Sequence, residues 1–281
     1  MREELVAERR PGTRVVAVSS GKGGVGKSNL SANLALAAAA LGRRTLIVDA
    51  DLSLANVDVL CGIVPSGNLG HVRRGEKSLE HILESIAEGV DLIPGASGLP
   101  EFVGGGREEA ESLLGSLRTF AGKYDLILID TPAGLDLQIL SFLTAADQVL
   151  LVTTPEPTAL TDVYALVKAL AKEARIPPVA FVVNRVSDAE EGRRAAERLR
   201  LVARRFLDLE LDFLGAIPED GRVVQAVKMQ RPFFLAFPRS PASLALVRVT
   251  ARLLDVEVRA ESQGLESFLR RLWQRFGRLP A

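Results

Sequence analysis

Short apolar runs alternate with longer helical stretches along most of the chain. The runs are rich in Val, Ile and Leu, and they lie near residues 14–19, 45–49, 90–94, 125–130, 147–153, 178–184 and 212–217. A run that is apolar at nearly every position indicates a strand buried on both faces of a parallel sheet. Between the runs, stretches such as residues 28–41 are rich in Ala and Leu and lack Gly and Pro, which favours helix. The pattern predicts a single doubly wound α/β domain with a mainly parallel sheet.

The two ends of the chain fall outside this alternation. Residues 1–13 are rich in charge and predict a flexible N-terminal segment, so we place the domain at residues 14–258. In residues 264–281, the apolar side chains fall within an arc of about 140° at about 100° per residue, and the arginines fall outside it. These apolar side chains are Leu265, Phe268, Leu269, Leu272, Trp273, Phe276 and Leu279. The segment predicts an amphipathic C-terminal helix that is either docked on the domain or bound to an anionic membrane surface.

A glycine-rich segment follows the first predicted strand. Gly21, Gly26, Lys27 and Ser28 occupy every fixed position of the pattern G-x-x-x-x-G-K-S/T, between a strand and a helix. Glycines let the backbone N–H groups of such a loop surround phosphate oxygens, and the helix N-terminus favours negative charge. The lysine reaches the β- and γ-phosphates, and the serine hydroxyl binds Mg²⁺. The predicted nucleotide-binding residues of this loop are Gly23, Gly24, Val25, Gly26, Lys27, Ser28 and Asn29.

The position of Lys22 leaves two roles open. It lies near the start of the glycine-rich loop, so its side chain need not face the phosphates of its own loop. Across a two-fold axis it would reach the nucleotide of a second subunit and add positive charge there, as an arginine finger does. The alternative is an exposed lysine in a tight turn.

Acidic residues mark the ends of two further predicted strands. Asp49 ends the run 45–49, Asp51 follows it, and Asp130 ends the run 125–130. Because ligands of doubly wound sheets bind at the carboxyl ends of the strands, these acids are well placed. In a Mg²⁺–phosphate site, a carboxylate holds the metal or orients the attacking water. We therefore predict a metal site from Ser28, Asp49 and Asp130. For Asp49 and Asp51, the alternative is capping of a helix or turn.

Composition and charge narrow the range of functions. Lys and Arg together number 35, as do Asp and Glu, and this neutral balance argues against a general attraction to nucleic acid. Glutamates dilute the arginines of residues 188–207, which predicts a solvated helix face. The lone Cys61 excludes an intrachain disulfide and fits a reducing cytosol, and His71 and His81 lack metal-like partners. No run of about 18 apolar residues occurs, so we expect no membrane span.

The segment from Lys22 to Ser28 resembles the deviant Walker A loop of the MinD/ParA family of ATPases, and the resemblance continues to about residue 279. It implies a P-loop fold and an ATP-dependent homodimer in which Lys22 completes the partner's site. It also implies that Asp51 positions water and that Asp130 is the Walker B acid, followed by switch II at residues 131–134. The catalytic residues implied by the resemblance are Lys22, Lys27 and Asp51.

The resemblance also implies a site for the nucleotide base. Asn184 lies at the end of a predicted strand and corresponds to an asparagine that contacts adenine, while Pro218, Glu219 and Asp220 correspond to a segment that wraps around the base with backbone contacts. The guanine-reading pattern K-x-D does not occur in the expected strand-end position, so ATP is favoured over GTP. The expected cofactors are therefore ATP and Mg²⁺, and the expected reaction is slow hydrolysis of ATP to ADP and phosphate.

For the C-terminal segment, the resemblance favours the membrane over docking on the domain. MinD-type proteins end in a helix that targets the membrane, so membrane contact is expected from Phe268, Leu269, Leu272, Trp273 and Phe276. One short helix binds weakly, whereas two helices in a dimer gain avidity through effective concentration. We therefore expect a cytoplasmic protein that binds the inner face of the cell membrane reversibly when ATP drives dimerisation.

Three stretches, residues 49–58, 92–98 and 152–162, resemble the FlhG (FleN) branch of the family, which regulates flagellar number and placement. Partners implied by this resemblance are the FlhF GTPase, a flagellar transcription regulator and flagellar switch proteins. Residues 1–13 lack the D-Q-A-x-x-L-R motif through which some members activate FlhF, which puts that activation in doubt. The alternatives are a MinD-type division-site ATPase, a ParA-like ATPase that segregates DNA or cargo, and an interaction module with a degenerate site.

Overall fold

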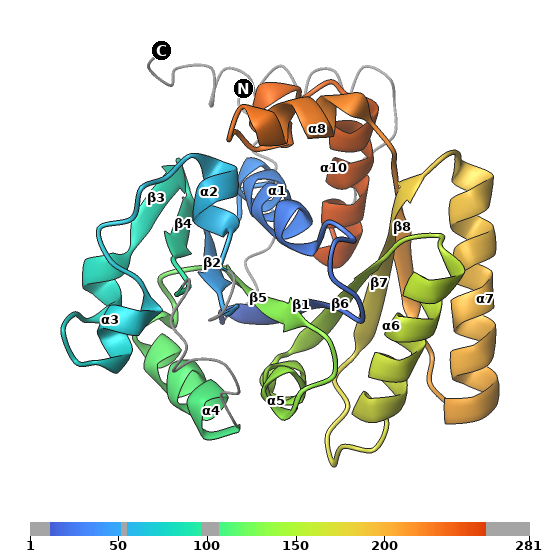
Figure 1. The fold of residues 1–281 in the computed structure, drawn as a ribbon, viewed down its shortest axis with the longest axis horizontal. Coiled ribbons are helices and arrows are strands. Elements are labelled where there is room, and N and C mark those ends of the chain that lie inside the picture. Colours follow the sequence, from blue (N-terminus) through green and yellow to red (C-terminus); the bar gives the residue numbers. More distant parts are fainter. Residues whose placement is uncertain (1–11, 52–54, 97–106, 257–281) are drawn as a thin grey trace, which may run out of the picture.

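The computed structural model describes residues 12–51, 55–96 and 107–256. Figure 1 shows a central sheet with helices on both faces. The sheet has eight strands in the order β3-β4-β2-β5-β1-β6-β7-β8. The strands are β1 (Arg14–Ser20), β2 (Thr45–Asp49), β3 (Glu84–Ala87), β4 (Val90–Ile93), β5 (Leu126–Ala133), β6 (Gln148–Thr153), β7 (Val179–Val186) and β8 (Asp212–Pro218). All neighbouring strands are parallel except β3 and β4, which confirms the predicted doubly wound fold.

Helices join the strands and cover both faces of the sheet. The α-helices are α1 (Lys27–Ala40), α2 (Val57–Cys61), α3 (Leu69–Arg73), α4 (Arg107–Ser116), α5 (Leu137–Ala145), α6 (Pro157–Leu170), α7 (Ala189–Leu207), α8 (Gly221–Lys228), α9 (Phe233–Ala236) and α10 (Pro241–Leu253). Two 3-10 helices, η1 (Leu79–Ile82) and η3 (Leu117–Phe120), complete the described elements. In the described ranges, none of the helices has the length and apolar character needed to cross a membrane.

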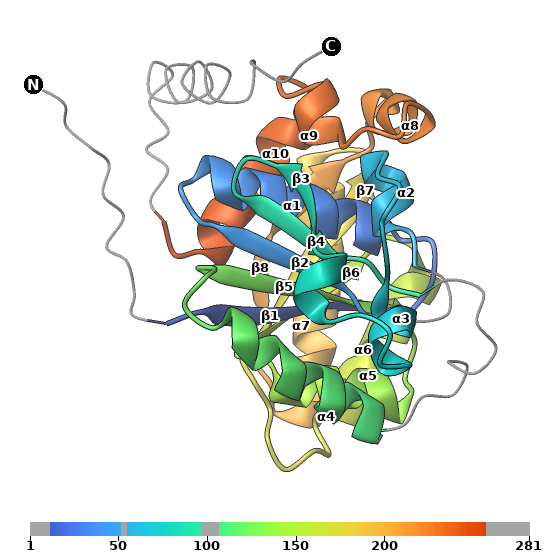
Figure 2. The same ribbon diagram turned by 90° about the vertical axis from the view of Figure 1, so that its left-hand side faces the viewer.

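The alternation of side chains along β1 shows how the core is divided. Val16 and Val18 lie on the sheet face covered by α1 and α10, whereas Ala17 lies on the face covered by α5 and α6. A third cluster, which contains Phe120 and Phe142, fills the space between the β2–β5 part of the sheet and η3. Figure 2 shows α1 and α10 on one side of the sheet and α4 and α5 on the other. Because strands such as β1 are buried on both faces, their central residues, 15–18 in β1, are apolar.

Strand β3 is the one described strand that the apolar runs did not predict. It has only four residues, it is half exposed, and it pairs with β4 in a hairpin closed by Glu88 and Gly89. Gly89 has φ +80°, a conformation that glycine adopts without strain. A short edge strand is not buried on both faces, so it produces no continuous apolar run. The central strand β5 also continues to Ala133, beyond its predicted end at residue 130.

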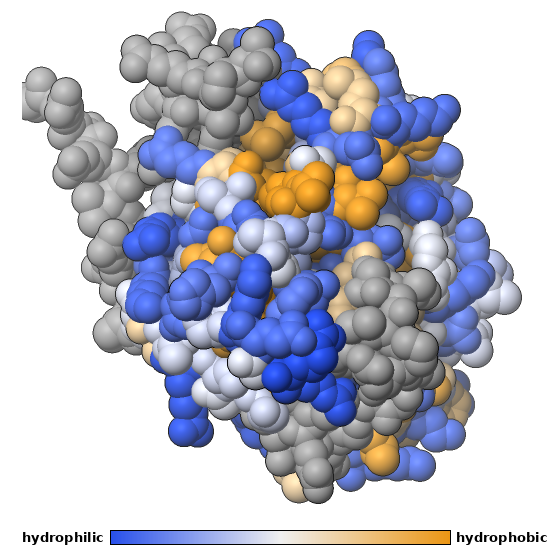
Figure 3. Space-filling model, turned by 60° about the vertical axis from the view of Figure 1, so that its left-hand side comes forward, coloured by the Kyte–Doolittle hydropathy of each residue, from blue (hydrophilic) through white to orange (hydrophobic). Residues whose placement is uncertain are grey.

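Apolar side chains also reach the surface on the α1 side of the sheet. Among the exposed large hydrophobic residues, Val59 lies in α2, while Val224 and Val227 lie in α8. The two helices meet where a Cβ added to Gly62 would come within 2.7 Å of the carbonyl oxygen of Gln230. Figure 3 shows apolar surface gathered on this side of the molecule. Of the predicted terminal segments, only Gly12 and Thr13 are described, and the C-terminal segment 264–281 lies outside the described residues.

Candidate functional site

The glycine-rich loop joins β1 to α1 and is held closely against two other elements. A Cβ added to Gly21 would lie 2.2 Å from the carbonyl carbon of Asp162 in α6. A Cβ added to Gly26 would lie 2.5 Å from Nδ2 of Asn184 in β7, and Gly26 also has φ +93°. Glycine is therefore required at Gly21 by the close approach of backbone and at Gly26 by the left-handed backbone conformation. The N-terminus of α1 has no side-chain cap, so its amide groups remain suited to an anion.

A buried ion pair links the loop to β5. Lys27 Nζ lies 2.9 Å from Asp130 Oδ2, and the two side chains are 8% and 0% exposed. Ser31 Oγ donates a hydrogen bond of 2.6 Å to Asp130 Oδ1, and Lys27 Nζ lies 3.3 Å from Ser28 Oγ. The structure thus brings Lys27, Ser28 and Asp130 together, and the predicted roles of these residues toward phosphate and metal stay predictions. Ser31 is a contact that sequence reasoning missed, although its position four residues after Lys27 on a helix places it on the same face.

The Asp130 carboxylate fits a Mg²⁺-binding role. Its Oδ2 atom is buried, and the Lys27 ammonium is the one polar group in contact with it among the described residues. No group of three His, Cys, Asp or Glu side chains in the described ranges forms a metal cage. Mg²⁺ in phosphate sites is held by one or two protein oxygens together with phosphate and water. Asp130 and the Ser28 hydroxyl are such oxygens, and the metal would neutralise charge on the phosphates.

Asp49 lies beside Asp130 but has different partners. The two residues are in register where β2 pairs with β5. Asp49 Oδ1 accepts a hydrogen bond from the amide of Asp51, and Oδ2 accepts hydrogen bonds from the amides of Asn56 and Val57. Burial and the charge of Asp130 raise the pKa of Asp49 to about 7, against the opposing effects of these hydrogen bonds and of Lys27. The predicted metal role of Asp49 stays a prediction. In the structure its carboxylate holds the amides of residues 51, 56 and 57, and we call this set of hydrogen bonds the Asp49 clamp.

Lys22 lies near the start of the loop, with its side chain against α6. Its Nζ atom is 3.4 Å from Glu156 Oε2 and 3.4 Å from Thr158 Oγ1, at the start of α6. The Lys22 side chain is 43% exposed, so a partner molecule has access to it. Sequence reasoning missed its contact with Glu156, because the two residues are distant in the chain and meet only through the packing of the loop on α6.

The predicted base-binding residues lie on β7 and at the end of β8. Asn184 Nδ2 donates a hydrogen bond of 2.8 Å to the carbonyl oxygen of Val25, so this side chain touches the phosphate loop. Pro218 ends β8, and the amide of Glu219 donates to the carbonyl oxygen of Val186. Asp220 caps α8 by accepting from the amide of Arg222, and it also accepts from the amide of Ala242. The contact of these residues with a base stays a prediction.

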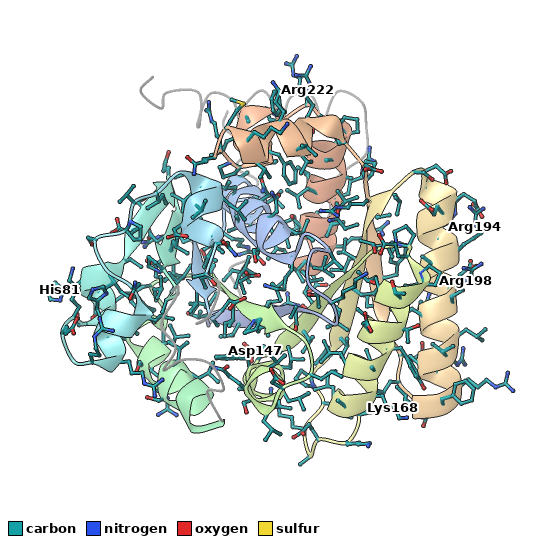
Figure 4. All side chains as sticks on the ribbon, viewed as in Figure 1. His81, Asp147, Lys168, Arg194, Arg198 and Arg222 are labelled. Carbon is teal, nitrogen blue, oxygen red and sulfur yellow. The ribbon has the colours of Figure 1, made fainter. Side chains whose placement is uncertain are left out.

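The arginine-rich helix α7 has a solvated face, as predicted. Figure 4 shows Arg194 and Arg198 on this helix at the edge of the molecule. Glu190 forms ion pairs with Arg193 and Arg194, and Glu210 pairs with two further arginines of the helix. These partners partly neutralise the arginines, so the helix does not present an undivided basic surface.

The fold and this loop define the class of the protein: a P-loop nucleotide-binding protein. A family model described as an AAA domain matches residues 13–175, which is more than half of the chain. The chain belongs to the MinD/ParA family of P-loop ATPases. The resemblance found in the sequence is thereby confirmed.

Two bacterial relatives match almost the whole chain. It is 42% identical to the antiactivator FleN of Pseudomonas aeruginosa, over 93% of this chain and 94% of FleN. It is 35% identical to the flagellum site-determining protein YlxH of Helicobacter pylori, over 96% of this chain and 93% of YlxH. Among solved structures, the septum site-determining protein MinD of Pyrococcus horikoshii, complexed with Mg-ADP, has a TM-score of 0.73 and 31% identity. That match covers 86% of this chain and 96% of the MinD chain.

Proposed function

We propose that this protein is a Mg-ATP-dependent dimerisation switch with slow ATPase activity, and that it regulates flagellar number and placement from the cytoplasmic membrane. The observation that carries the nucleotide part is the buried Lys27–Asp130 pair beside Ser28, at the end of a glycine loop. The flagellar part is supported by the likeness to FleN and to the flagellum site-determining protein YlxH. Both alignments cover nearly the whole chain.

In the proposed mechanism, phosphate binding and water activation fall to different residues. The Lys27 ammonium binds the β- and γ-phosphates, and Asp130 and Ser28 hold the metal that neutralises them. Asp51 orients the attacking water. Lys22 of each subunit contacts the nucleotide of the other subunit, which requires a side chain that points away from its own loop. The exposed position of Lys22 supports this arrangement.

The mechanism is tested with the variant Asp51→Ala. Loss of the water-positioning carboxylate should stop hydrolysis while ATP binding continues, so the ATP-bound dimer should accumulate. Light scattering coupled to gel filtration, with ATP and with ADP, would show a dimer only with ATP. Wild-type protein is the control, because it returns to monomer as ATP is consumed. A variant that stays monomeric with ATP would contradict the mechanism.

Membrane binding is tested by co-sedimentation with vesicles that contain anionic lipid. The full chain is compared with a chain that ends at Ser262, each with ATP and with ADP. Binding that needs both ATP and residues 263–281 supports the switch, because two anchoring helices in a dimer bind more tightly than one. If the protein binds no vesicles in any condition, the membrane interpretation is wrong, and a C-terminal helix docked on the domain becomes the favoured alternative.

The likeness to MinD structures keeps a role in division-site placement as the second candidate function. Its chemistry and membrane switch would be the same, so the partner distinguishes the two. Pull-down of the Asp51→Ala dimer on FlhF, a flagellar transcription regulator and flagellar switch proteins supports the flagellar role if one of them binds with ATP only. A ParA-like role would instead show ATP-dependent DNA binding that weakens steeply with salt.

A further inference from the structure

The carboxylate of Asp49 binds backbone at two places, one two residues further along the chain and the other seven to eight residues further along. Its Oδ1 atom is 3.2 Å from the amide nitrogen of Asp51, and its Oδ2 atom is 3.0 Å and 3.1 Å from those of Asn56 and Val57. Val57 is the first residue of α2. A single side chain therefore binds the backbone of the proposed water-positioning residue and the start of the next helix.

The two neighbouring acids of the site differ in what occupies their oxygens. Both oxygens of Asp49 accept hydrogen bonds from backbone amides, one on Oδ1 and two on Oδ2, whereas Asp130 Oδ2 has only the Lys27 ammonium beside it. A carboxylate that accepts several amide hydrogen bonds is held in one orientation, and three of its roughly four lone-pair sites are in use. Asp130 is thus the acid with more acceptor capacity left for a metal, and Asp49 is the acid that organises backbone.

The surroundings of Asp49 leave it little freedom to move. Its side chain is 1% exposed. A Cβ added to Gly95, just beyond the end of β4, would lie 2.7 Å from the Asp49 carbonyl oxygen and 3.2 Å from its Cγ. The same added atom would lie 2.7 Å from Cβ of Ala55. Because Gly95 has no Cβ, the backbone just beyond β4 packs directly against Asp49 and Ala55. A larger residue at this position would displace one or both of them.

We infer that Asp49 is a positioning residue, which sets the backbone that carries Asp51 and does not bind the metal. The inference deepens the proposed ATPase function and rests on it. The amide hydrogen bonds fix residue 51 relative to β2, and β2 is fixed relative to Asp130 by the β2–β5 register. Catalysis depends steeply on the placement of reacting groups, so loss of this clamp should lower turnover more than substrate binding.

The experiment compares Asp49→Asn with Asp130→Asn in the full chain. The first variant keeps the size of the side chain but replaces one acceptor oxygen with an NH₂ group, which faces amide donors. We expect hydrogen exchange in a peptide covering residues 55–61 to become at least about tenfold faster. We expect kcat for ATP to fall by about 10- to 100-fold, with KM changed less than about threefold. The Mg²⁺ concentration for half-maximal binding of a fluorescent ADP analogue should stay within about twofold of wild type.

Asp130→Asn should give the opposite pattern. Its Mg²⁺ requirement should rise at least about tenfold, while exchange in residues 55–61 stays near the wild-type rate. Gly95→Ala provides a second route if Asp49→Asn does not fold, because it presses on the clamp and leaves the carboxylate in place. It should reproduce the Asp49→Asn pattern, with faster exchange, a lower kcat and an unchanged Mg²⁺ requirement.

Two results would overturn the inference. If Asp49→Asn raised the Mg²⁺ requirement as Asp130→Asn does and left exchange unchanged, Asp49 would be a metal ligand. If exchange became faster but kcat stayed at the wild-type value, the clamp would serve only the fold. Wild-type protein that binds no Mg-nucleotide would overturn the proposed function and the catalytic part of this inference with it. The exchange rates would still decide whether Asp49 clamps residues 51, 56 and 57.

Discussion

The phosphate side and the base side of the proposed nucleotide site are held by different kinds of contact. On the phosphate side, the groups in contact are those that would act on the ligand: Lys27 pairs with Asp130 in a buried position. On the base side, the polar side chains bind the protein's own backbone: Asn184 donates to Val25, and Asp220 accepts from two amides. The phosphate side should therefore depend on the charge of individual side chains, whereas Asp220 on the base side should matter more for stability than for binding.

The largest effect is expected from Lys27→Ala. The change removes the proposed phosphate ligand and leaves Asp130 as a buried charge without its partner. Removal of one member of a buried pair costs about 3–5 kcal/mol of unfolding free energy. Chemical denaturation without nucleotide should show this loss, and titration with a fluorescent ADP analogue should show no binding.

The double variant Lys27→Ala with Asp130→Asn separates the two consequences. Because the asparagine carries no charge, most of the lost unfolding free energy should return. Nucleotide binding should not return, since the lysine is still missing. A single Lys27→Ala variant as stable as wild type would show that the Lys27–Asp130 pair does not stabilise the fold.

A smaller loss is expected from Gly21→Ala. The added methyl group would meet the backbone of α6 at 2.2 Å, and backbone cannot move aside as a flexible side chain can. Overpacking of this kind costs about 1–3 kcal/mol. The matched control is Gly23→Ala in the same loop, where an added Cβ meets nothing within 4 Å. Thermal unfolding without nucleotide should separate the two variants, and equal melting temperatures would show that the loop and α6 are not packed this closely.

Removal of a base-side acid should affect stability more than binding. Asp220→Ala loses the cap of α8 and the contact with Ala242, so we expect a loss of about 1 kcal/mol. ATP affinity should change little, because the proposed contact of this segment with the base is made by backbone. A large loss of affinity with unchanged stability would reverse the comparison between the two sides.

The same carboxylate gives this prediction a pH dependence. Burial raises the pKa of Asp220, but the amide hydrogen bonds from Arg222 and Ala242, the Ser240 side chain and the Arg222 charge together bring the pKa below its ordinary value of 3.8. A group with a lowered folded pKa stabilises the fold above the unfolded pKa, and this contribution is lost as the pH falls through the folded value. The difference in unfolding free energy between wild type and Asp220→Ala should therefore be full at pH 7 and should shrink in acid below the ordinary pKa.

The contrast between the two sides also explains what could be predicted from the sequence. The phosphate loop is specified by residues within eight positions, so its spacing alone identified Lys27 and Ser28, and the strand ends identified Asp130. The partners of Asp49, Lys22 and Asp220 were not predicted. Asp220 meets Ala242 and Lys22 meets Glu156 only because segments distant in the sequence pack together in the folded chain. The edge strand β3 was missed for a related reason, since its half-exposed sequence depends on β4 for its partner.

The smallest effect on stability, with the largest consequence for assembly, is expected from Lys22→Ala. The ion pair of Lys22 with Glu156 is exposed and 3.4 Å long, and such pairs contribute about 0–1 kcal/mol. The unfolding free energy of the monomer should therefore barely change, while the ATP-dependent dimer seen by light scattering should be lost. Glu156→Gln is the matched control, because it breaks the same pair and keeps the lysine. If both variants lose the dimer, dimerisation depends on the Lys22–Glu156 ion pair within one subunit. If only Lys22→Ala loses the dimer, the lysine acts on the other subunit.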